Sequence, residues 1–108
     1  MEIEGKTLDM EVDTGAAVSV IAENVYRQNF GYVVLQESHW LLKSYSGHKL
    51  DTVGEIEVHV VYGKITKTLP LVVIRGNGPT LLGRNWMAEI RLDWFAIKQI
   101  QEEKLWNR

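Results

Sequence analysis

Strict alternation of apolar and polar residues near the middle of the chain is the feature that most limits the fold. Between residues 55 and 60, isoleucine and valine alternate with glutamate and histidine. A strand shows this period of two when one face is buried and the other faces solvent. Tyr62-Gly63-Lys64 then supplies a turn into another apolar stretch at residues 65–69. The pattern predicts a long β-hairpin and a domain built mainly from β-sheet.

The residues before this hairpin predict a strand and a helix. Apolar and polar residues alternate over residues 8–12, which indicates a half-buried strand preceded by a turn at Gly5-Lys6. Residues 19–28 are expected to form a short helix with Ser19 as its N-cap.

A smaller hairpin is expected between that helix and the long hairpin. Residues 32–36 and 40–45 favour strands, and the second of them leads into the turn-forming cluster Ser46-Gly47-His48-Lys49. This cluster is predicted to be the tip of the hairpin.

The last part of the chain completes an all-β domain. Residues 71–74 suit a strand buried on both faces, residues 86–90 a short helix, and residues 91–95 a final strand. The strand count predicts a closed barrel or sandwich with one or two short helices. We expect one domain over residues 1–95 and a C-terminal extension, helical or flexible, over residues 96–108.

Composition restricts the function classes. The 108 residues suffice for one domain but not for a two-lobed enzyme with duplicated halves. The net charge of −2 argues against a broad nucleic-acid-binding surface, and the lack of cysteine excludes disulfides and thiolate chemistry. No apolar run approaches the ~18 residues of a membrane span, and the N-terminus is too polar for a signal peptide. We therefore expect an intracellular domain without a cofactor, a metal, a nucleic-acid partner or a membrane partner.

Asp13-Thr14-Gly15 is the candidate for chemistry because it directly follows the first half-buried strand. At a strand end, backbone amides can fix a carboxylate in place. Taken alone, an Asp-x-Gly triplet is usually a β-turn in which the aspartate caps its own backbone. The surrounding sequence and a second motif favour a catalytic interpretation here.

Two motifs together resemble the retroviral-type (retropepsin) aspartic peptidases. They are Val12-Asp13-Thr14-Gly15-Ala16-Ala17-Val18-Ser19-Val20-Ile21 and, some 60 residues later, Leu81-Leu82-Gly83-Arg84-Asn85-Trp86. The resemblance covers roughly residues 3–95 with the elements in order. The wording of the second half is similar to the protease segment of gypsy-class LTR retrotransposon polyproteins. The resemblance implies a retropepsin-like closed β-barrel that is a single lobe of a two-fold dimer.

The resemblance also implies an aspartic endopeptidase that processes a Gag-Pol polyprotein. Such an enzyme needs one carboxylate to deprotonate a water and one carboxylic acid to protonate the carbonyl oxygen, and the two carboxyls share a proton. This chain has one Asp-Thr-Gly, since Asp51-Thr52 is followed by Val53. The second aspartate must therefore come from another copy of the chain, which predicts a C2 homodimer.

Roles for individual residues follow from the resemblance. Asp13 is the catalytic carboxyl, Thr14 bonds across the dimer axis, and Gly15 lets a substrate backbone approach closely. The hairpin tip corresponds to the flap over an extended peptide. The expected substrate-binding residues are Ala16, Ala17, Tyr45, Ser46, Gly47 and His48. The expected structural support consists of Leu82, Gly83, Arg84 and Asn85.

One position departs from the family pattern. Many retroviral proteases carry an aspartate where this chain has Ala17, and that aspartate pairs with the arginine at the position of Arg84. Arg84 has therefore lost its usual partner, and we expect it to bind another carbonyl or carboxylate.

Other functions were weighed against the protease. Glu55, Glu57 and His59 lie too far apart along one strand to share a small metal ion, so they are interpreted as a solvated face. The first remaining alternative is a domesticated or inactive module that keeps the fold for dimerisation or peptide binding. The second is a monomeric, inactive trimmed protease chain.

Overall fold

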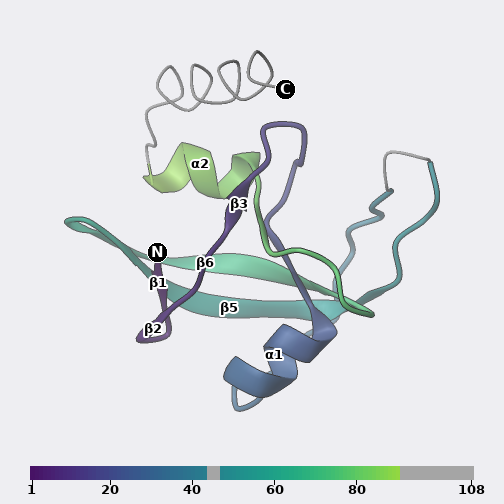
Figure 1. Cartoon of the computed structure of the whole chain (residues 1–108), viewed down its shortest axis with the longest axis horizontal. Coiled ribbons are helices and arrows are strands. Elements are labelled where there is room, and N and C mark those ends of the chain that lie inside the picture. Colours follow the sequence, from purple (N-terminus) through teal and green to yellow (C-terminus); the bar gives the residue numbers. More distant parts are fainter. Residues whose placement is uncertain (44–46, 91–108) are drawn as a thin grey trace, which may run out of the picture.

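A long antiparallel hairpin runs through the centre of the molecule (Figure 1). The structure is a computed structural model, and it describes residues 1–43 and 47–90. The hairpin consists of β5 (Thr52–Tyr62) and β6 (Ile65–Ile74), which pair along their whole length. In β5 the side chains of Ile56, Val58 and Val60 are fully buried, while those of the alternating polar residues reach the surface. The predicted long hairpin is confirmed.

β6 is longer than the sequence predicts, because the expected strands at residues 65–69 and 71–74 are one strand that passes through Pro70. The amide of Val72 donates to Ser19 O on the side of β6 that faces β4 (Val20–Ala22). Pro70 lies two residues earlier and so faces the same side, but β4 pairs with β6 only from Val72 onward. The missing proline amide therefore costs no ladder hydrogen bond.

The strands of the described residues form one seven-stranded sheet in the order β2-β1-β5-β6-β4-β7-β3. The elements not yet given are β1 (Glu2–Ile3), β2 (Lys6–Thr7), β3 (Glu11–Val12) and β7 (Leu81–Leu82). β1 pairs antiparallel with β2 and β5, whereas β3 pairs parallel with β7. The result is a mostly-β half-barrel with two short helices, which confirms the predicted fold class.

The N-terminal strand is shorter than its alternating pattern suggests. Only Glu11–Val12 of residues 8–12 pair as a strand, while Leu8 and Met10 pack partly buried against the core. The preceding turn is at Glu4 and Gly5, whose φ angles are 52° and 77°, one residue earlier than predicted. β1 and β2 pair with each other on either side of this turn. Lys6, which was predicted to belong to the turn, is therefore part of β2.

The predicted helix at residues 19–28 is wrong at its start. Residues 20–22 form β4, and α1 begins only afterwards (Glu23–Asn29). Ser19 is fully buried and caps no helix, and the residue before α1, Ala22, makes no side-chain capping bond. The β-branched pair Val20-Ile21 is drawn into the sheet because β6 and β7 lie on either side of it. Local helix signals lose to this tertiary pairing.

The second helix, α2 (Arg84–Ile90), begins two residues earlier than predicted. Figure 1 shows α1 and α2 on opposite sides of the β5–β6 hairpin. Trp86, Met87 and Ile90 of α2 join the main hydrophobic cluster, and so do Tyr26 and Phe30 from the region of α1. Both helix regions therefore contribute side chains to one hydrophobic core, which also includes residues of the central sheet.

The smaller hairpin is less regular than predicted. We call it the flap hairpin, with a first arm at residues 36–43 and a second arm at residues 47–51. Its arms are joined by an antiparallel bridge between Lys43 and Lys49 and by a bond from the Leu50 amide to Leu42 O. Residues 32–36 do not form the expected strand, although Gln36 bridges Glu55 of β5. The alternation in this region is too weak to specify a long pairing.

Some predictions fall on residues outside those described. They are the tip residues Tyr45 and Ser46, the strand at residues 91–95 and the extension at residues 96–108. Among the helices of the described part, none has the length and apolar character needed to cross a bilayer.

Candidate active site

Asp13 lies at the carboxyl end of β3, where its backbone is tied to β7. The parallel pairing sets Val12 beside Leu82, and the Asp13 amide donates to Leu82 O at 3.0 Å. Two residues earlier in both strands, the Glu11 amide donates to Thr80 O at 2.9 Å. The position of Asp13 therefore depends on a strand that comes almost 70 residues later in the chain.

The loop after β3 folds back on the Asp13 side chain. The Gly15 amide donates to Asp13 Oδ1 at 2.9 Å, and the Ala16 amide donates to Asp13 O at 3.1 Å. Asp13 and Thr14 are half-buried, whereas Gly15 is exposed. The carboxylate is thus oriented by its own loop and stands at the surface, as expected for an aspartate that meets a group from outside.

The start of α2 carries this loop. The Arg84 amide donates to Ala16 O at 2.8 Å, and the Asn85 amide donates to Ala17 O at 3.1 Å. The first amides of a helix have no partner within the helix, so they are available to bind neighbouring carbonyls. The structure therefore brings the predicted support segment, residues 82–85, directly against the Asp13 loop.

A buried serine that the sequence analysis interpreted as a helix cap completes this support. Ser19 Oγ accepts a bond from the Gly83 amide at 2.9 Å and lies 3.3 Å from Asn85 Oδ1. Asn85 Oδ1 also accepts bonds from the amides of Ser19 at 3.0 Å and Trp86 at 2.8 Å. The signal that could have revealed this role is the serine between two β-branched residues, since a fully buried hydroxyl needs a partner.

Gly83 allows the closest approach in the site. A Cβ at this position would overlap the carbonyl carbon and oxygen of Val18. The backbones of the two motifs, residues 12–21 and 81–86, therefore touch without a side chain between them.

These two motifs pack against each other as one unit, and both lie within the region that a known family model matches. The family model described as "Retroviral aspartyl protease" matches residues 1–94. The chain belongs to the retroviral aspartyl protease family.

A solved structure of a retroviral protease shows the same fold. It is "EIAV protease complexed with the inhibitor HBY-793", which matches with a TM-score of 0.72 at 20% sequence identity. The alignment covers 84% of each chain. No curated protein matches the sequence.

Within this retroviral protease fold, Arg84 lies beside the active-site loop with a weak contact. Its Nη1 is 3.4 Å from Thr14 O, and its side chain makes no ion pair with a carboxylate of the described residues. Ala17, where many family members have the partner aspartate, is exposed. Arg84 therefore contacts a backbone carbonyl, one of the two kinds of partner expected from the sequence.

The described part of the flap hairpin carries two of the predicted substrate-binding residues. Gly47 and His48 are exposed, and Gly47 has a φ of 82°, a conformation that glycine adopts without strain. Residues 44–46, which include Tyr45 and Ser46, lie outside the described residues.

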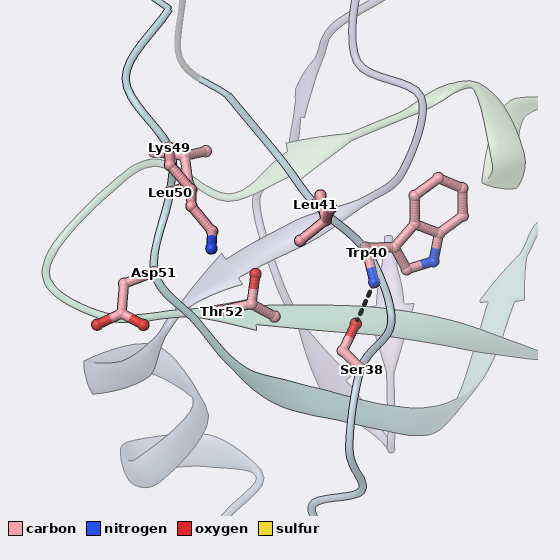
Figure 2. Close-up of a pocket in the computed structure, with 7 residues that line it drawn as sticks. All are labelled: Ser38, Trp40, Leu41, Lys49, Leu50, Asp51 and Thr52. Carbon is pink, nitrogen blue, oxygen red and sulfur yellow. Dashed lines mark hydrogen bonds between the residues drawn. The ribbon is translucent and has the colours of Figure 1, made fainter.

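Two pockets described for residues 1–43 and 47–90 of the protease chain do not include Asp13. An open pocket of about 350 Å³ lies between the arms of the flap hairpin (Figure 2). It is lined by Ser38, Trp40, Leu41, Lys49, Leu50, Asp51 and Thr52. A second pocket of about 320 Å³ lies beside β3 and includes Val12 and Leu82 but not Asp13. Asp13, which is half-buried, therefore belongs to neither of these two pockets.

Cation ligands are not gathered in the described part of the chain. Within residues 1–43 and 47–90, no three His, Asp or Glu side chains are grouped so that they could hold a metal ion. Glu57 and His59 point from the solvent face of β5, as the sequence analysis proposed for that face.

Proposed function

We propose that this aspartic protease domain is an endopeptidase that hydrolyses extended polypeptides as a homodimer, with one Asp13 from each copy. The observation that carries the proposal is the state of Asp13 in a single chain. Its carboxylate accepts the Gly15 amide, its loop is bound by the first amides of α2, and the residue is partly exposed to solvent. Each chain has one such carboxylate, and hydrolysis by an aspartate pair needs two.

In the proposed dimer the two Asp13 carboxyls lie together on the two-fold axis. Like charges at short range cannot both ionise easily, so the pair holds one proton. The ionised carboxylate takes a proton from the attacking water, and the protonated one gives its proton to the carbonyl oxygen. The water oxygen bonds to the carbonyl carbon, which gives a gem-diol. As the C–N bond breaks, the carboxyl that took the water proton gives it to the amine nitrogen, and the other carboxylate takes a proton from one hydroxyl of the gem-diol. The products are a carboxylic acid and an amine, and the pair again holds one proton.

The residues around Asp13 take supporting roles in this mechanism. Thr14 bonds across the dimer axis, and Gly15 leaves room for the substrate backbone. The substrate lies as an added strand between the Asp13 loops and the flap hairpin. Its proposed contacts are Ala16, Ala17, Tyr45, Ser46, Gly47 and His48.

The proposed substrate is a retroelement Gag-Pol polyprotein. The support is the family membership together with the likeness of the second half of the sequence to gypsy-class proteases. Such a substrate places the enzyme inside the cell, in the cytoplasm or in the retroelement particle.

The Asp13→Asn variant tests the proposed function. Asparagine keeps the size of the side chain and an oxygen acceptor for the Gly15 amide, but it cannot act as a general base. We expect cleavage of an extended apolar peptide to fall by at least about a hundredfold while circular dichroism and the unfolding midpoint stay near those of the wild type.

Two results would contradict the proposal. One is undiminished cleavage by the folded Asp13→Asn variant. The other is an active wild type that is insensitive to peptides with a hydroxyl isostere at the scissile bond, since such peptides mimic the tetrahedral intermediate.

A further inference from the structure

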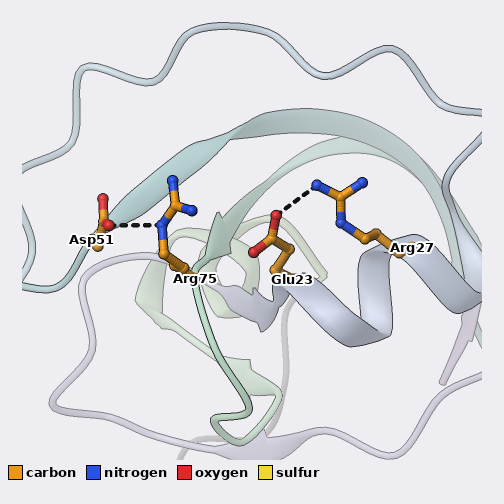
Figure 3. Close-up of polar contacts among 4 residues, drawn as sticks. All are labelled: Glu23, Arg27, Asp51 and Arg75. Atoms are coloured by element: carbon orange, nitrogen blue, oxygen red, sulfur yellow. Dashed lines mark hydrogen bonds and ion pairs between the residues drawn. The ribbon is translucent and has the colours of Figure 1, made fainter.

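The second arm of the flap hairpin ends in a double connection to the loop after β6. The Arg75 amide donates to Asp51 O at 2.8 Å, and Arg75 Nε donates to Asp51 Oδ2 at 2.7 Å (Figure 3). A main-chain bond and a charge-assisted side-chain bond between the same two residues fix both their distance and their relative orientation. This connection, the Asp51–Arg75 tie, continues the β5–β6 pairing by one residue pair beyond Thr52 and Ile74, at the point where the second arm of the flap hairpin enters β5.

The loop that contains Arg75 leads directly to the segment that holds Asp13. Residues 75–79 connect β6 to Thr80, whose carbonyl accepts the Glu11 amide at 2.9 Å. Two residues later, Leu82 O accepts the Asp13 amide at 3.0 Å. The Asp51–Arg75 tie therefore lies one short loop, residues 76–79, away from the segment whose carbonyls bind Glu11 and Asp13.

The first arm of the flap hairpin is held in a different way. Gln36 and Glu55 exchange two backbone bonds of 2.8 Å each. Beside them Gly54 leaves no room for a side chain, because a Cβ there would lie 2.6 Å from Gln36 O. The first arm is thus attached to β5, and the Asp51–Arg75 tie attaches the second arm to the β6–β7 loop.

The exposure of the tie indicates that its role is positional. The side chains of Arg75 and Asp51 are 62% and 67% exposed. Exposed ion pairs contribute little to the free energy of folding, so loss of this pair leaves the core intact. We expect loss of the pair to let the second arm of the flap hairpin move more freely relative to the Asp13 loop.

We propose that Asp51 and Arg75 are positioning residues that hold the flap hairpin at the height above Asp13 at which an extended peptide binds. The proposal rests on the proposed function, and it concerns substrate affinity and not the chemical step. Because the pair is exposed, its contribution weakens as salt rises and the Debye length shortens.

The test compares the Arg75→Gln variant with the wild type and with a matched control. The control is Arg27→Gln, which removes the arginine of an equally short exposed pair, Arg27 to Glu23 at 2.7 Å, within α1 (Figure 3). We expect Arg75→Gln to raise the KM for an extended peptide about two- to fivefold with kcat nearly unchanged. Arg27→Gln leaves both constants at wild-type values. The KM of the wild type rises with ionic strength toward that of Arg75→Gln, whose own KM depends less on salt.

Charge reversal gives a second readout. Arg75→Asp places two carboxylates together and is expected to raise the KM further, and adding Asp51→Arg is expected to restore most of the affinity. A loss of stability alone would not be rescued by this exchange.

Amide exchange reports on the tie without any activity. The Arg75 amide, which donates to Asp51 O, is expected to exchange faster with deuterium in Arg75→Gln, while the Phe30 amide at the end of α1 is unchanged. A wild type that cleaves no peptide would overturn the proposed function and leave this measurement intact. The proposed role of the tie would be overturned if the wild type is active and Arg75→Gln has the same KM, the same salt dependence of KM and the same amide exchange rate at position 75.

Discussion

At the scale of single residues, the candidate active site is built from backbone contacts that two small residues make possible. Ser19 and Gly83 touch no substrate in the proposed mechanism, yet they set the distance between the Asp13 loop and α2. Ser19 provides a buried hydroxyl for the Gly83 amide, and Gly83 lets Val18 approach. Neither role can be replaced by a larger or an apolar side chain without moving the loop.

Gly83→Ala is expected to destabilise the fold and reduce activity. The added Cβ overlaps the Val18 carbonyl group, so the loop or α2 must shift, at a cost of about 1–3 kcal/mol. Urea unfolding measures the change in the free energy of unfolding. Gly78→Ala is the control, because a Cβ at Gly78 meets nothing within 4 Å. Equal midpoints for the two variants would contradict the close-approach argument.

Ser19→Ala tests the buried hydroxyl. The substitution leaves the Gly83 amide without its acceptor in the interior, and we expect a loss of about 1–3 kcal/mol in unfolding free energy. Ser38→Ala removes a hydroxyl that only accepts the exposed Trp40 amide at 3.3 Å, and it should cost less than about 0.5 kcal/mol. The two variants are compared by thermal unfolding, and a Ser19→Ala midpoint equal to that of Ser38→Ala would show that Ser19 is not needed.

At the scale of elements, the periodicity of the sequence predicted the pairing of neighbouring strands. It failed where a strand pairs with segments that lie far away in the sequence. The β5–β6 hairpin follows from its alternation and turn, and the family motifs located Asp13 and the start of α2. The strand β4 was predicted as helix because its neighbours, β6 and β7, come about 50 to 60 residues later. Residues 32–36 were predicted as a strand but make a single bridge, because their alternation is too weak to specify a longer pairing.

The indole of Trp86 contributes a hydrogen bond between α2 and the sheet. Trp86 is fully buried, and its Nε1 donates to Pro70 O. Trp86→Phe keeps most of the apolar volume but leaves that carbonyl unpaired, so we expect a loss of about 1–3 kcal/mol in unfolding free energy. Trp40→Phe, at a side chain that is 45% exposed, should change it by less than about 0.5 kcal/mol. Guanidinium unfolding separates the two, and similar values would argue against the buried bond.

At the scale of the whole molecule, the proposed function makes each chain one half of a catalytic apparatus. One Asp-Thr-Gly follows β3, a short strand at the edge of the sheet, and Asp13 lines neither of the two described pockets. A two-fold axis would bring two equivalent carboxyls together between the chains. The proposed activity is therefore a property of a pair of chains.

Mixing wild-type chains with Asp13→Asn chains tests this dependence. If chains pair at random, activity per wild-type chain falls to about one half at equal amounts and about one tenth at a ninefold excess of variant. Sedimentation of the wild type should show about twice the chain mass of 12.4 kDa. Activity that follows the wild-type concentration alone, whatever the excess of variant, would mean that a single chain suffices.

The pairing of β3 with β7 determines how late in synthesis the Asp13 loop can reach its folded conformation. Asp13 is translated early, but the strand that fixes it and the helix that supports its loop are among residues 81–90. During synthesis from the N-terminus, the emerging chain carries its reactive carboxyl without any of these supports. Nearly all of residues 1–90 must therefore be synthesised before the Asp13 loop can adopt its folded conformation. Under the proposed function, cleavage therefore cannot begin before residues 81–90 have been synthesised.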